Sequence, residues 1–480
     1  MSALGGDWEM VVGLEVHTEL KTATKLFCGC ANHFGSEPNT NICPVCLGLP
    51  GSLPVLNAGA VELAIRIGTA LHCEVRPSTF HRKNYFYPDQ PKDFQISQYD
   101  EPINAEGYLD LPDGSRVRIE RAHLEEDTGK TTHLGGTGRI HGSQESMVDY
   151  NRAGVPLVEI VSGPDMRSAA QARTYAAELR AILIASGASD GRMEEGSMRV
   201  DANVSVRQGP DAPYGTRCEI KNLNSLRSVQ RAVAYEAERQ VAILEAGGAI
   251  SQETRHWDED AGRTETLRSK EEANDYRYFT EPDLVPLSPT ASQIARVAAE
   301  LPAMPAERRA LLIEQLGGSP KDTQVDQVLS AVEQGLDRYV SAAITAGAPP
   351  ALAVARVANE LAGLLPQAAT LPEADFASLL VLEHDGALSA TQAKTVLAEL
   401  VEAGGGDPQA VATAHGFEQL DTSALDAVLD ELVSTHPDEW TRYVEGDDKL
   451  AGFFTGKVMA ATKGQADGKA VNQALRSRRG

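Results

Sequence analysis

The segment 198–206 reads Met-Arg-Val-Asp-Ala-Asn-Val-Ser-Val, in which apolar and polar residues alternate strictly. This alternation predicts a β-strand, because successive side chains of a strand point to opposite faces. One face would carry alanine and valine and join a core, whereas the other would carry Arg199, Asp201, Asn203 and Ser205. Since Asp and Asn are depleted in strands, the polar face indicates a surface that binds something.

Other segments place acidic residues in the same way. Leu14–His17 and Val148–Asn151 alternate, and Val117–Glu120 leads into the acidic run Glu125–Asp127. Several strands are therefore expected to direct carboxylates toward a shared place. Hard oxygen ligands suit Mg²⁺ or Ca²⁺, and protein-bound Mg²⁺ commonly also holds nucleotide phosphates, which arginines can meet. The arginines available for this are Arg152, Arg199 and Arg268. A network of surface carboxylates without a metal is the alternative.

Length and charge narrow the class of protein. A chain of 480 residues predicts roughly three domains, each able to bury its own core. The first residues lack the pattern of a secretory signal, and no apolar run approaches the roughly 20 residues of a membrane span, so we expect a cytoplasmic protein without a membrane segment. A net charge of −24 argues against non-specific adhesion to nucleic acid, so any such partner must meet a local basic surface.

Four of the six cysteines lie close together as a Cys-x-Cys pair and a Cys-x-x-Cys pair. They are Cys28, Cys30, Cys43 and Cys46. Two such turns can surround one metal ion with four thiolates, the arrangement of a closed tetrahedral zinc site. Since four sulfur ligands leave no open position, this zinc would hold the loop 28–46 and would not take part in catalysis. Reduced cysteines without a metal and an iron–sulfur cluster are the alternatives.

A second zinc pattern is weaker. His17-x-Glu19 followed by Cys43-x-x-Cys46 resembles the signature of zinc nucleobase deaminases. That signature requires a proline before the first cysteine, where this chain has Ile42, and it gives no role to the Cys-x-Cys pair. The deaminase interpretation is therefore disfavoured.

The pattern of residues changes along the chain. Residues 1–290 mix short alternating segments with two expected helices, one between Pro164 and Gly187 and one that begins near Ser225. Residues 291–405 are rich in Ala and Leu and predict a helical domain, which ends at the glycine run before Pro408. Residues 406–480 predict a small helical tail. We therefore expect an α+β fold: a mixed or antiparallel sheet domain with a zinc-binding insertion, then an all-α domain and an α-helical tail.

Six segments in matching order resemble the B-subunit family of the heterotrimeric aspartyl/glutamyl-tRNA amidotransferases. The likeness covers nearly the whole chain and is dense between residues 11 and 290. The segments are GLEVH at 13–17, RKNYFYPD at 82–89 with QISQ at 95–98, HLEED at 123–127, DYNRAGVPLVEI at 149–160, EIKNLNS at 219–225 and DYRYF at 275–279.

The resemblance implies a ligase that corrects mischarged tRNA in two steps. ATP and Mg²⁺ would be used to phosphorylate the side-chain carboxylate of Glu-tRNA(Gln) or Asp-tRNA(Asn). Ammonia released by a glutaminase, which is the A subunit, would then displace the phosphate, and a small C subunit would complete the heterotrimer. An ionised carboxylate is itself the nucleophile, so positioning and charge neutralisation would suffice for the first step.

Residue roles follow from the same resemblance. The Mg²⁺ ligands would be Glu15, His17 and Glu125, with Asp149 and Asn151 as further candidates. Because Mg²⁺ prefers oxygen, His17 could instead orient a bound water. Glu126 and Asp201 would join Glu15 and Glu125 in the catalytic set, and Asn203 would position substrate with the arginines.

Two further regions receive functions from the resemblance. The segment 83–98 would line an ammonia tunnel, with Lys83, Tyr85, Asp89 and Lys92 as its polar residues. The tail carries six basic residues and one acidic residue between 457 and 480, which suits contact with tRNA phosphates. Its candidate tRNA contacts are Lys457, Lys463, Lys469 and Arg476.

The chain departs from the family in the tail, at Ala460 and Gly468, which makes the tRNA contacts there less determined than the acidic site. A rival hypothesis from another class is a non-catalytic tRNA-binding scaffold in the same complex. The two differ at the acidic strands, since only the enzyme requires them for ATP-dependent activation.

Overall fold

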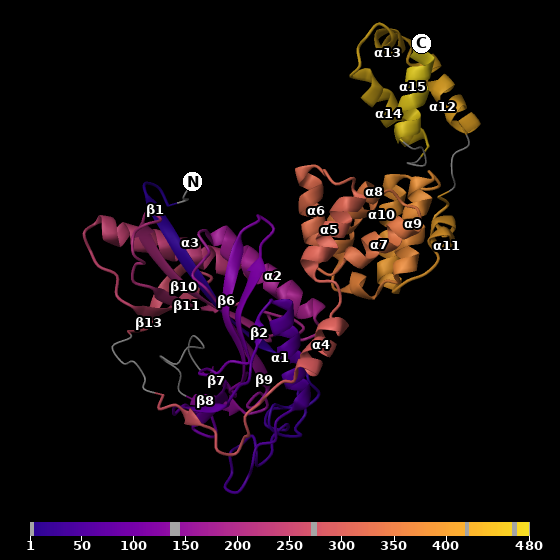
Figure 1. Ribbon diagram of the computed structural model, residues 1–480. Coiled ribbons are helices and arrows are strands. Elements are labelled where there is room, and N and C mark those ends of the chain that lie inside the picture. The colour runs from indigo at the N-terminus through magenta and orange to yellow at the C-terminus, as the bar shows by residue number, and fades with distance from the viewer. Residues whose placement is uncertain (1–3, 135–144, 270–275, 418–421, 463–467, 480) are drawn as a thin grey trace. The chain divides into compact units, whose positions relative to one another are not determined.

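The computed structural model forms two compact units, Met1–Pro305 and Ala306–Gly480. The first unit is built on a sheet and the second is helical, so the fold is mixed α+β with an N-terminal sheet, as predicted (Figure 1). The structure describes residues 4–134, 145–269, 276–417, 422–462 and 468–479, without the side chains of 267–269, 422–424 and 468–470.

Twelve strands of the first unit form one sheet, in which neighbouring strands run antiparallel except for β11 and β12. The strand order is β13-β12-β11-β10-β1-β9-β6-β4-β3-β14, with β5 also beside β6 and β2 beside β5. Strands β7 and β8 form a separate two-stranded sheet. The strands are β1 Trp8–Glu19, β2 Glu74–Val75, β3 His81–Asn84, β4 Phe94–Ser97, β5 Asn104–Asp110, β6 Arg116–Glu126, β7 Lys130–Leu134, β8 Glu145–Asp149, β9 Pro156–Ser162, β10 Met198–Gln208, β11 Cys218–Leu223, β12 Glu253–Asp258, β13 Arg263–Ser269 and β14 Phe279–Thr280.

Strand β10 has the alternation that its sequence predicts. Val200, Ala202 and Val204 are at most 1% exposed and belong to the core of the first unit, whereas Asp201 and Asn203 are only partly buried. The chain pairs β10 with β1 through eleven residues of register, so the N-terminal strand lies in the middle of the sheet. The polar face of β10 thereby continues onto β1.

Helices cover the apolar face of the sheet. Helices α2 and α3 contact each other and pack on β1 and β10, and α1 packs on β5 and β6 (Figure 1). Both α2 and α3 begin at a serine whose hydroxyl accepts a backbone N–H of the first turn, as expected for an N-cap, which confirms the two predicted helices. The helices of this unit are α1 Ala58–Ala70, α2 Ala169–Ala185, α3 Leu226–Glu245 and α4 Ala291–Glu300.

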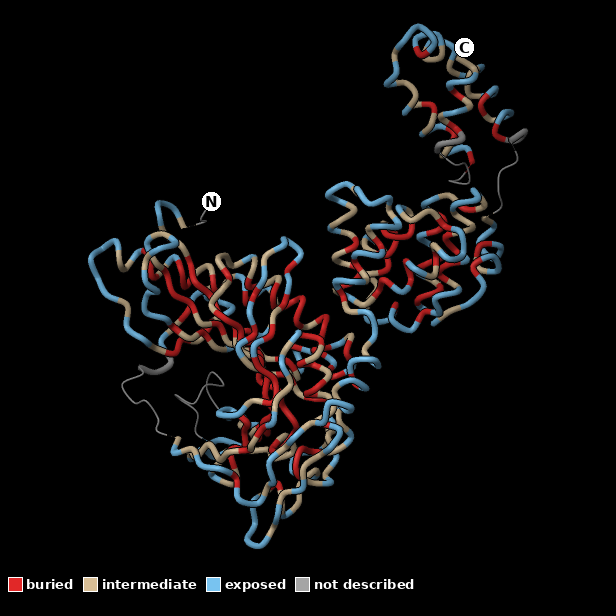
Figure 2. The backbone as a smooth tube through the Cα atoms, viewed as in Figure 1, coloured by how far each residue is buried: buried red, intermediate tan, exposed pale blue. Residues whose placement is uncertain are grey.

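The second unit contains two separate hydrophobic clusters, one between Leu312 and Ala412 and one between Leu425 and Leu475 (Figure 2). The glycine run before Pro408 caps α10, and Gly406 donates its backbone N–H to Asp375 at 2.8 Å. The helices are α5 Pro305–Gln315, α6 Asp322–Glu333, α7 Asp337–Thr345, α8 Pro350–Asn359, η1 Leu361–Leu364, η2 Gln367–Thr370, α9 Glu373–His384, α10 Ala390–Ala403, α11 Pro408–Ala414, α12 Thr422–Thr435, α13 Pro437–Val444, α14 Leu450–Ala461 and α15 Gly468–Arg479.

Within the described residues, none of these helices combines the length and the apolar character that crossing a membrane requires.

Candidate active site

Four neighbouring strands place a row of charged side chains on the polar face of the sheet. His17 of β1 pairs directly with Arg199 of β10 and with Glu159 of β9, and Glu159 pairs with His123 of β6. Directly opposed residues of antiparallel strands project to the same face, so the register alone brings these four side chains together. Glu125 lies two residues beyond His123 on the same strand and the same face.

The row closes into a compact cluster. The Nε2 atom of His17 lies 3.4 Å from Oε2 of Glu159 and 3.9 Å from Oε1 of Glu125, and Nε2 of His123 lies 3.7 Å from Oε2 of Glu125. One ligand atom each from His17, Glu125 and Glu159 falls within 4.8 Å of the others. Glu125 is 4% exposed and His123 is fully buried. We call His17, Glu125 and Glu159 the acidic cluster.

Burial and like charge perturb these groups. Burial is the main cause that raises the pKa of Glu15 to about 7, with the charge of Glu159 adding to it. Burial alone would lower the pKa of His17, but hydrogen bonding to Glu159 and the charges of Glu159 and Glu125 outweigh it and raise this pKa to about 9. The carboxyl groups of Glu15 and Glu159 therefore lie close enough that the negative charge of Glu159 opposes ionisation of Glu15.

The donor set fits a divalent cation. Carboxylate oxygens are the ligands that Mg²⁺ prefers, and a cation held by the acidic cluster would offset the repulsion between the carboxylates of Glu125 and Glu159. Within the described part of the chain, neither ring nitrogen of the buried His123 has a hydrogen-bond partner, which is costly unless another group meets it.

Two arginines meet at a second buried carboxylate. Asp127 accepts a hydrogen bond from Nη2 of Arg199 at 2.8 Å, and Nε of Arg152 lies 3.5 Å from the same Oδ2 atom. Although burial opposes it, the charges of Arg199 and Arg152 hold the pKa of Asp127 below its usual value. Two of the three arginines that the sequence predicts to bind phosphates therefore lie beside each other.

Asp201 and Asn203, two further predicted site residues of β10, lie two and four positions beyond Arg199. Asp201 pairs with Glu15 in the strand register and accepts a hydrogen bond from Nζ of Lys221 at 2.7 Å. Lys221 also lies 3.1 Å from Glu219, and burial fails to lower its pKa because the two carboxylates raise it. Asn203 lines a separate cavity of about 240 Å³.

Glu126 points away from the acidic cluster. Because it follows Glu125 in a strand, its side chain lies on the opposite face, where it pairs with Lys92 and accepts the backbone N–H of Ile96 at 3.0 Å. Glu126 and Lys92 line a cavity of about 330 Å³ together with Cys28 and Cys46. The two neighbouring glutamates that the sequence grouped together therefore serve different pockets.

The four clustered cysteines converge as predicted, with ligand atoms within 4.8 Å of one another. The sulfur atoms of Cys43 and Cys46 are 3.9 Å apart, and the backbone N–H of Cys43 donates to the Cys46 sulfur at 3.1 Å. Hydrogen bonding from Cys28 is the main cause that lowers the pKa of Cys46 to about 5. An all-sulfur set with a low-pKa member fits a tetrahedral zinc ion.

Asp149 and Asn151 hold the cysteine-bearing loop. Asp149 accepts the backbone N–H of Asn39 at 2.9 Å, and Asn151 accepts the backbone N–H of Asn41 at 2.7 Å and donates to the Glu37 carbonyl. Asp149 belongs to neither of the two groups of converging His, Cys, Asp and Glu side chains found within the described residues. Their oxygens are thus engaged by the loop backbone.

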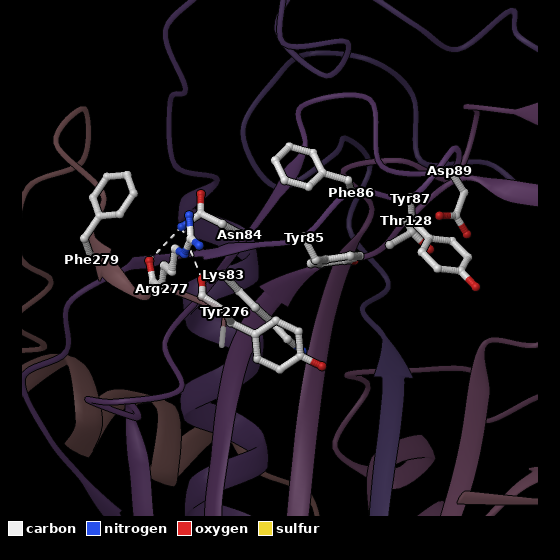
Figure 3. Close-up of a pocket in the computed structure, with 10 residues that line it drawn as sticks. All are labelled: Lys83, Asn84, Tyr85, Phe86, Tyr87, Asp89, Thr128, Tyr276, Arg277 and Phe279. Atoms are coloured by element: carbon white, nitrogen blue, oxygen red, sulfur yellow. Dashed lines mark hydrogen bonds between the residues drawn. The ribbon is translucent and has the colours of Figure 1, made fainter. Parts of the chain in front are cut away.

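Three of the four predicted tunnel residues, Lys83, Tyr85 and Asp89, line one cavity of about 1080 Å³, which Figure 3 shows. Lys92 lines the cysteine-side cavity instead. In the tail, Lys457 and Arg476 are exposed. Lys463 and the side chains of Lys469 and Arg268 lie outside the described residues.

Sequence reasoning missed Glu159 as a ligand candidate, and it gave no role to His123 or Asp127. Glu159 is the single charge in the otherwise apolar strand Pro156–Ser162. A lone carboxylate in a buried strand is costly unless it is paired, and that signal could have identified it.

Family models match most of the chain. The GatB/GatE catalytic domain matches residues 10–295, and the GatB domain matches residues 338–478. The chain is 52% identical to the B subunit of the aspartyl/glutamyl-tRNA(Asn/Gln) amidotransferase of Frankia casuarinae, over 98% of this chain and 96% of that protein. The same-named proteins of Salinispora arenicola and Thermosynechococcus vestitus are 50% and 46% identical, over 98% of this chain and 97% and 96% of their own lengths. The chain therefore belongs to the family of amidotransferase B subunits.

Proposed function

We propose that this chain is the part of the enzyme that activates Glu-tRNA(Gln) or Asp-tRNA(Asn) with ATP and converts the activated side chain to an amide. Its relatives are named as the B subunit of an aspartyl/glutamyl-tRNA(Asn/Gln) amidotransferase, a ligase of several subunits. The observation that carries the proposal is the acidic cluster beside the two arginines on Asp127. Such a site can neutralise phosphate charge on both the metal and the arginine side.

The chemistry requires two displacements. In the first, a carboxylate oxygen of the aminoacyl side chain forms a bond to the γ-phosphorus of ATP, and the bond to ADP breaks. In the second, the nitrogen of ammonia attacks the carbonyl carbon, phosphate leaves with the electron pair of the C–O bond, and the nitrogen loses a proton. A bound Mg²⁺ would supply neutralisation of the phosphate charge.

The predicted residues on the polar face of the sheet would bind Mg²⁺, the phosphates and the substrate in these two steps. Glu125 and Glu159 would hold Mg²⁺ together with Glu15, whose side chain hydrogen-bonds that of Glu159, and His17 would orient one ligand or a bound water. Arg152 and Arg199 would turn from Asp127 toward the phosphates. Asp201 and Asn203 of β10 would orient the substrate carboxylate, and Arg268 of β13 would be a further arginine for the phosphates.

Ammonia would come from the glutaminase, the A subunit, and the small C subunit would complete a cytoplasmic heterotrimer. We place the ammonia route along Lys83, Tyr85, Asp89 and Lys92, with the Lys92–Glu126 pair facing the cysteine-bearing loop. Zinc on the four cysteines would hold that loop. Asp149 and Asn151 would support the same loop through its backbone.

The direct test uses the purified heterotrimer. Amide formation on Glu-tRNA(Gln) and on Asp-tRNA(Asn) is measured with and without ATP, and ADP is quantified in the same reaction. We expect amide and ADP in equal amounts on at least one tRNA and neither product without ATP. Amide formation that proceeds equally without ATP would reject ATP-dependent activation.

For the second unit, we propose a helical domain up to about residue 405 and a tRNA-binding tail beyond it. Exchanging Lys457 and Arg476 for Glu should weaken tRNA binding and reduce its salt dependence, by about one in the slope of log affinity against log salt for each phosphate interaction that is removed. Both side chains are exposed, so the fold should tolerate the change. Binding is measured between about 50 and 200 mM salt.

The matched control is Arg227→Glu, which reverses an exposed charge on α3 in the first unit. It should leave the slope unchanged. An unaltered affinity and slope in the Lys457/Arg476 double variant would remove the tail from the tRNA interface.

A further inference from the structure

Two residues of β6 without a role in the proposed reaction flank the acidic cluster. Arg121, His123 and Glu125 are alternate residues of the strand and therefore project to the same face of the sheet. In the register with β9, His123 lies directly opposite Glu159, and Arg121 lies opposite Val161. The strand pairing thus places one histidine and one arginine beside the two carboxylates of the cluster.

The two oxygens of Glu125 face different partners. Oε1 lies 3.9 Å from Nε2 of His17, the third member of the acidic cluster. Oε2 lies 3.7 Å from Nε2 of His123 instead. One oxygen is therefore directed toward the other candidate ligands and the second toward the histidine of β6. We call this second oxygen, Oε2, the outer oxygen of Glu125.

Glu159 is divided in the same way. Its Oε2 atom lies 3.4 Å from Nε2 of His17, and its Oε1 atom accepts a hydrogen bond from Nη2 of Arg121 at 3.4 Å. Nε2 of His123 is 3.9 Å from Oε2 of Glu159, slightly farther than from the outer oxygen of Glu125. Oε1 is thus the outer oxygen of Glu159, and Arg121 holds it.

His123 and Arg121 both have hydrogen-bond donors to spare. His123 is fully buried, and within the described residues its two ring nitrogens and Nε of Arg121 lack a hydrogen-bond partner. A buried polar group without a partner costs free energy, so each such group in a native protein requires an explanation. The ring of Tyr99 meets that of His123 edge to face at 6.3 Å and lies 4.6 Å from the guanidinium of Arg121. One aromatic side chain thus packs against both residues and restricts where they can point.

The number of oxygens that each carboxylate offers distinguishes Mg²⁺ from Ca²⁺. Ca²⁺ takes about six to eight oxygen ligands and accepts both oxygens of one carboxylate, whereas Mg²⁺ demands near-ideal octahedral geometry and usually keeps several waters. A carboxylate whose second oxygen is held by a protein donor can offer only one oxygen. Donors on the outer oxygens therefore favour the smaller cation.

We propose that Arg121 and His123 are positioning residues that hold the outer oxygens of Glu159 and Glu125, so that the acidic cluster selects Mg²⁺ over Ca²⁺. With its proton on Nε2, His123 donates to the outer oxygen of Glu125, which gives the buried donor a partner. Hydrogen-bonding groups behind metal ligands commonly orient those ligands in this way. The inference rests on the proposed function, because that proposal places Mg²⁺ at the cluster, and it adds the residues that determine which cation binds.

Direct binding of the cation by His123 is the competing explanation. Its Nε2 atom lies within 4.0 Å of both carboxylates, as a ligand could. Within the described residues, however, the group of converging ligand atoms contains His17, Glu125 and Glu159 but not His123. His123 also faces the oxygen of Glu125 that is directed away from His17. A position behind the ligands therefore fits the geometry better.

The test measures binding of Mg²⁺ and Ca²⁺ to the assembled heterotrimer, freed of exchangeable divalent cations and without ATP or tRNA. Mn²⁺ is the probe, and its displacement by each cation is followed by electron paramagnetic resonance. The displacement curves give the two dissociation constants and their ratio. Glu125→Gln identifies the part of the binding that belongs to the acidic cluster.

His123→Leu and Arg121→Met should each weaken Mg²⁺ binding by about 10- to 100-fold, as expected when a group that orients a ligand is lost. Ca²⁺ binding should change much less, because Ca²⁺ can use the released oxygen, so the ratio should shift toward Ca²⁺ by at least about tenfold. His123→Gln keeps an N–H donor and should retain the wild-type ratio. The control is Thr18→Val, since Thr18 is fully buried beside His17 but donates to Ser189 on the core face.

Wild-type ratios in both His123→Leu and Arg121→Met would overturn the proposal, and so would an equal loss of affinity for the two cations. Loss of a nitrogen bound directly to Mn²⁺ in His123→Leu, observed by pulsed electron paramagnetic resonance, would make His123 a ligand and equally reject it. If His123→Leu does not fold, Arg121→Met still decides, because the Arg121 side chain is 22% exposed and its replacement is easier to accommodate.

The outcome is separable from that of the proposed function, because the assay contains no ATP and measures no product. A complex that forms amide normally while both variants keep the wild-type ratio would reject this inference alone. A cluster that selects Mg²⁺ through these two residues, in a complex that forms no amide, would reject the proposed function alone.

Discussion

Glu125→Gln in the assembled enzyme should lower ATP-dependent activation of the aminoacyl side chain by at least about 100-fold, because it removes a charged ligand from the site that neutralises phosphate. The substitution preserves the shape of a side chain that is 4% exposed, so packing is retained. The rate is measured as ADP formed in the presence of mischarged tRNA. Affinity for that tRNA should remain nearly unchanged, since the side chain is buried in the sheet.

The effect of Mg²⁺ on the unfolding temperature of Glu125→Gln is a second, independent test. The buried carboxylates of Glu125 and Glu159 each offer an oxygen within 4.8 Å of the other, so their negative charges repel each other. Without Mg²⁺, the variant should therefore unfold at a temperature equal to or above that of the wild type. Adding Mg²⁺ at about 100 times its dissociation constant should stabilise the wild type by about 2.7 kcal/mol and the variant by much less.

The matched control is Glu178→Gln on α2. Glu178 is also a buried carboxylate, 7% exposed, but it belongs to a helix that packs on the sheet's other face. It should retain activity and show the wild-type response to Mg²⁺. Normal ADP formation by Glu125→Gln would reject the acidic cluster as the activating site.

The strands and helices with strong patterns could be predicted from the sequence. The alternation in residues 198–206 indicated both the strand and its buried face, and Ser225 marked where α3 begins. These signals are local, because side-chain period and backbone capping involve residues only a few positions apart. The convergence of four cysteines was also predictable, since their short spacing restricts where their sulfur atoms can lie.

The composition of the acidic cluster was harder to predict, because it depends on strand order. Strand β1 lies between β10 and β9, far from both in sequence, and only this order sets His17 against Glu159. Asp149 and Asn151 are ligand candidates through the resemblance, and in the structure the Oδ1 atom of each accepts a backbone N–H group of the cysteine-bearing loop. Residue type alone does not distinguish a carboxylate that binds a cation from one that holds a loop.

The period of two could have separated Glu125 from Glu126 without a structure. Adjacent residues of a strand face opposite ways, so only one of them can join a site on the polar face. The structure pairs Glu126 with Lys92 on the other side, beside the cysteines. Because Lys92 and Glu126 line this pocket together with Cys28 and Cys46, disorder of the cysteine-bearing loop would also disturb the proposed ammonia route.

Cys46→Ser should abolish metal binding by the cysteine-bearing loop, reducing zinc from about one ion per chain to a trace, because a closed tetrahedral site requires all four ligands. Cys46 is the buried member of the set, and its lowered pKa makes it the readiest thiolate. Zinc is measured by elemental analysis of the purified chain. The loop between residues 28 and 55 should become susceptible to protease well below the global unfolding temperature, as expected when a local unit loses its metal.

In Cys46→Ser, the rate of amide formation should decrease because the loop loses its order, whereas tRNA binding should persist. The cavity that contains Lys92 and Glu126 is also lined by Cys28, Cys46 and Gly48, so a disordered loop would open the proposed ammonia route to water. Cys73→Ser is the control, because Cys73 stands apart from the four ligands and should leave zinc content unchanged. Visible absorbance and iron in the wild type would indicate an iron–sulfur cluster, and full zinc content in Cys46→Ser would show that the metal lies elsewhere. Loss of zinc with unchanged amide formation would separate the loop from the ammonia route.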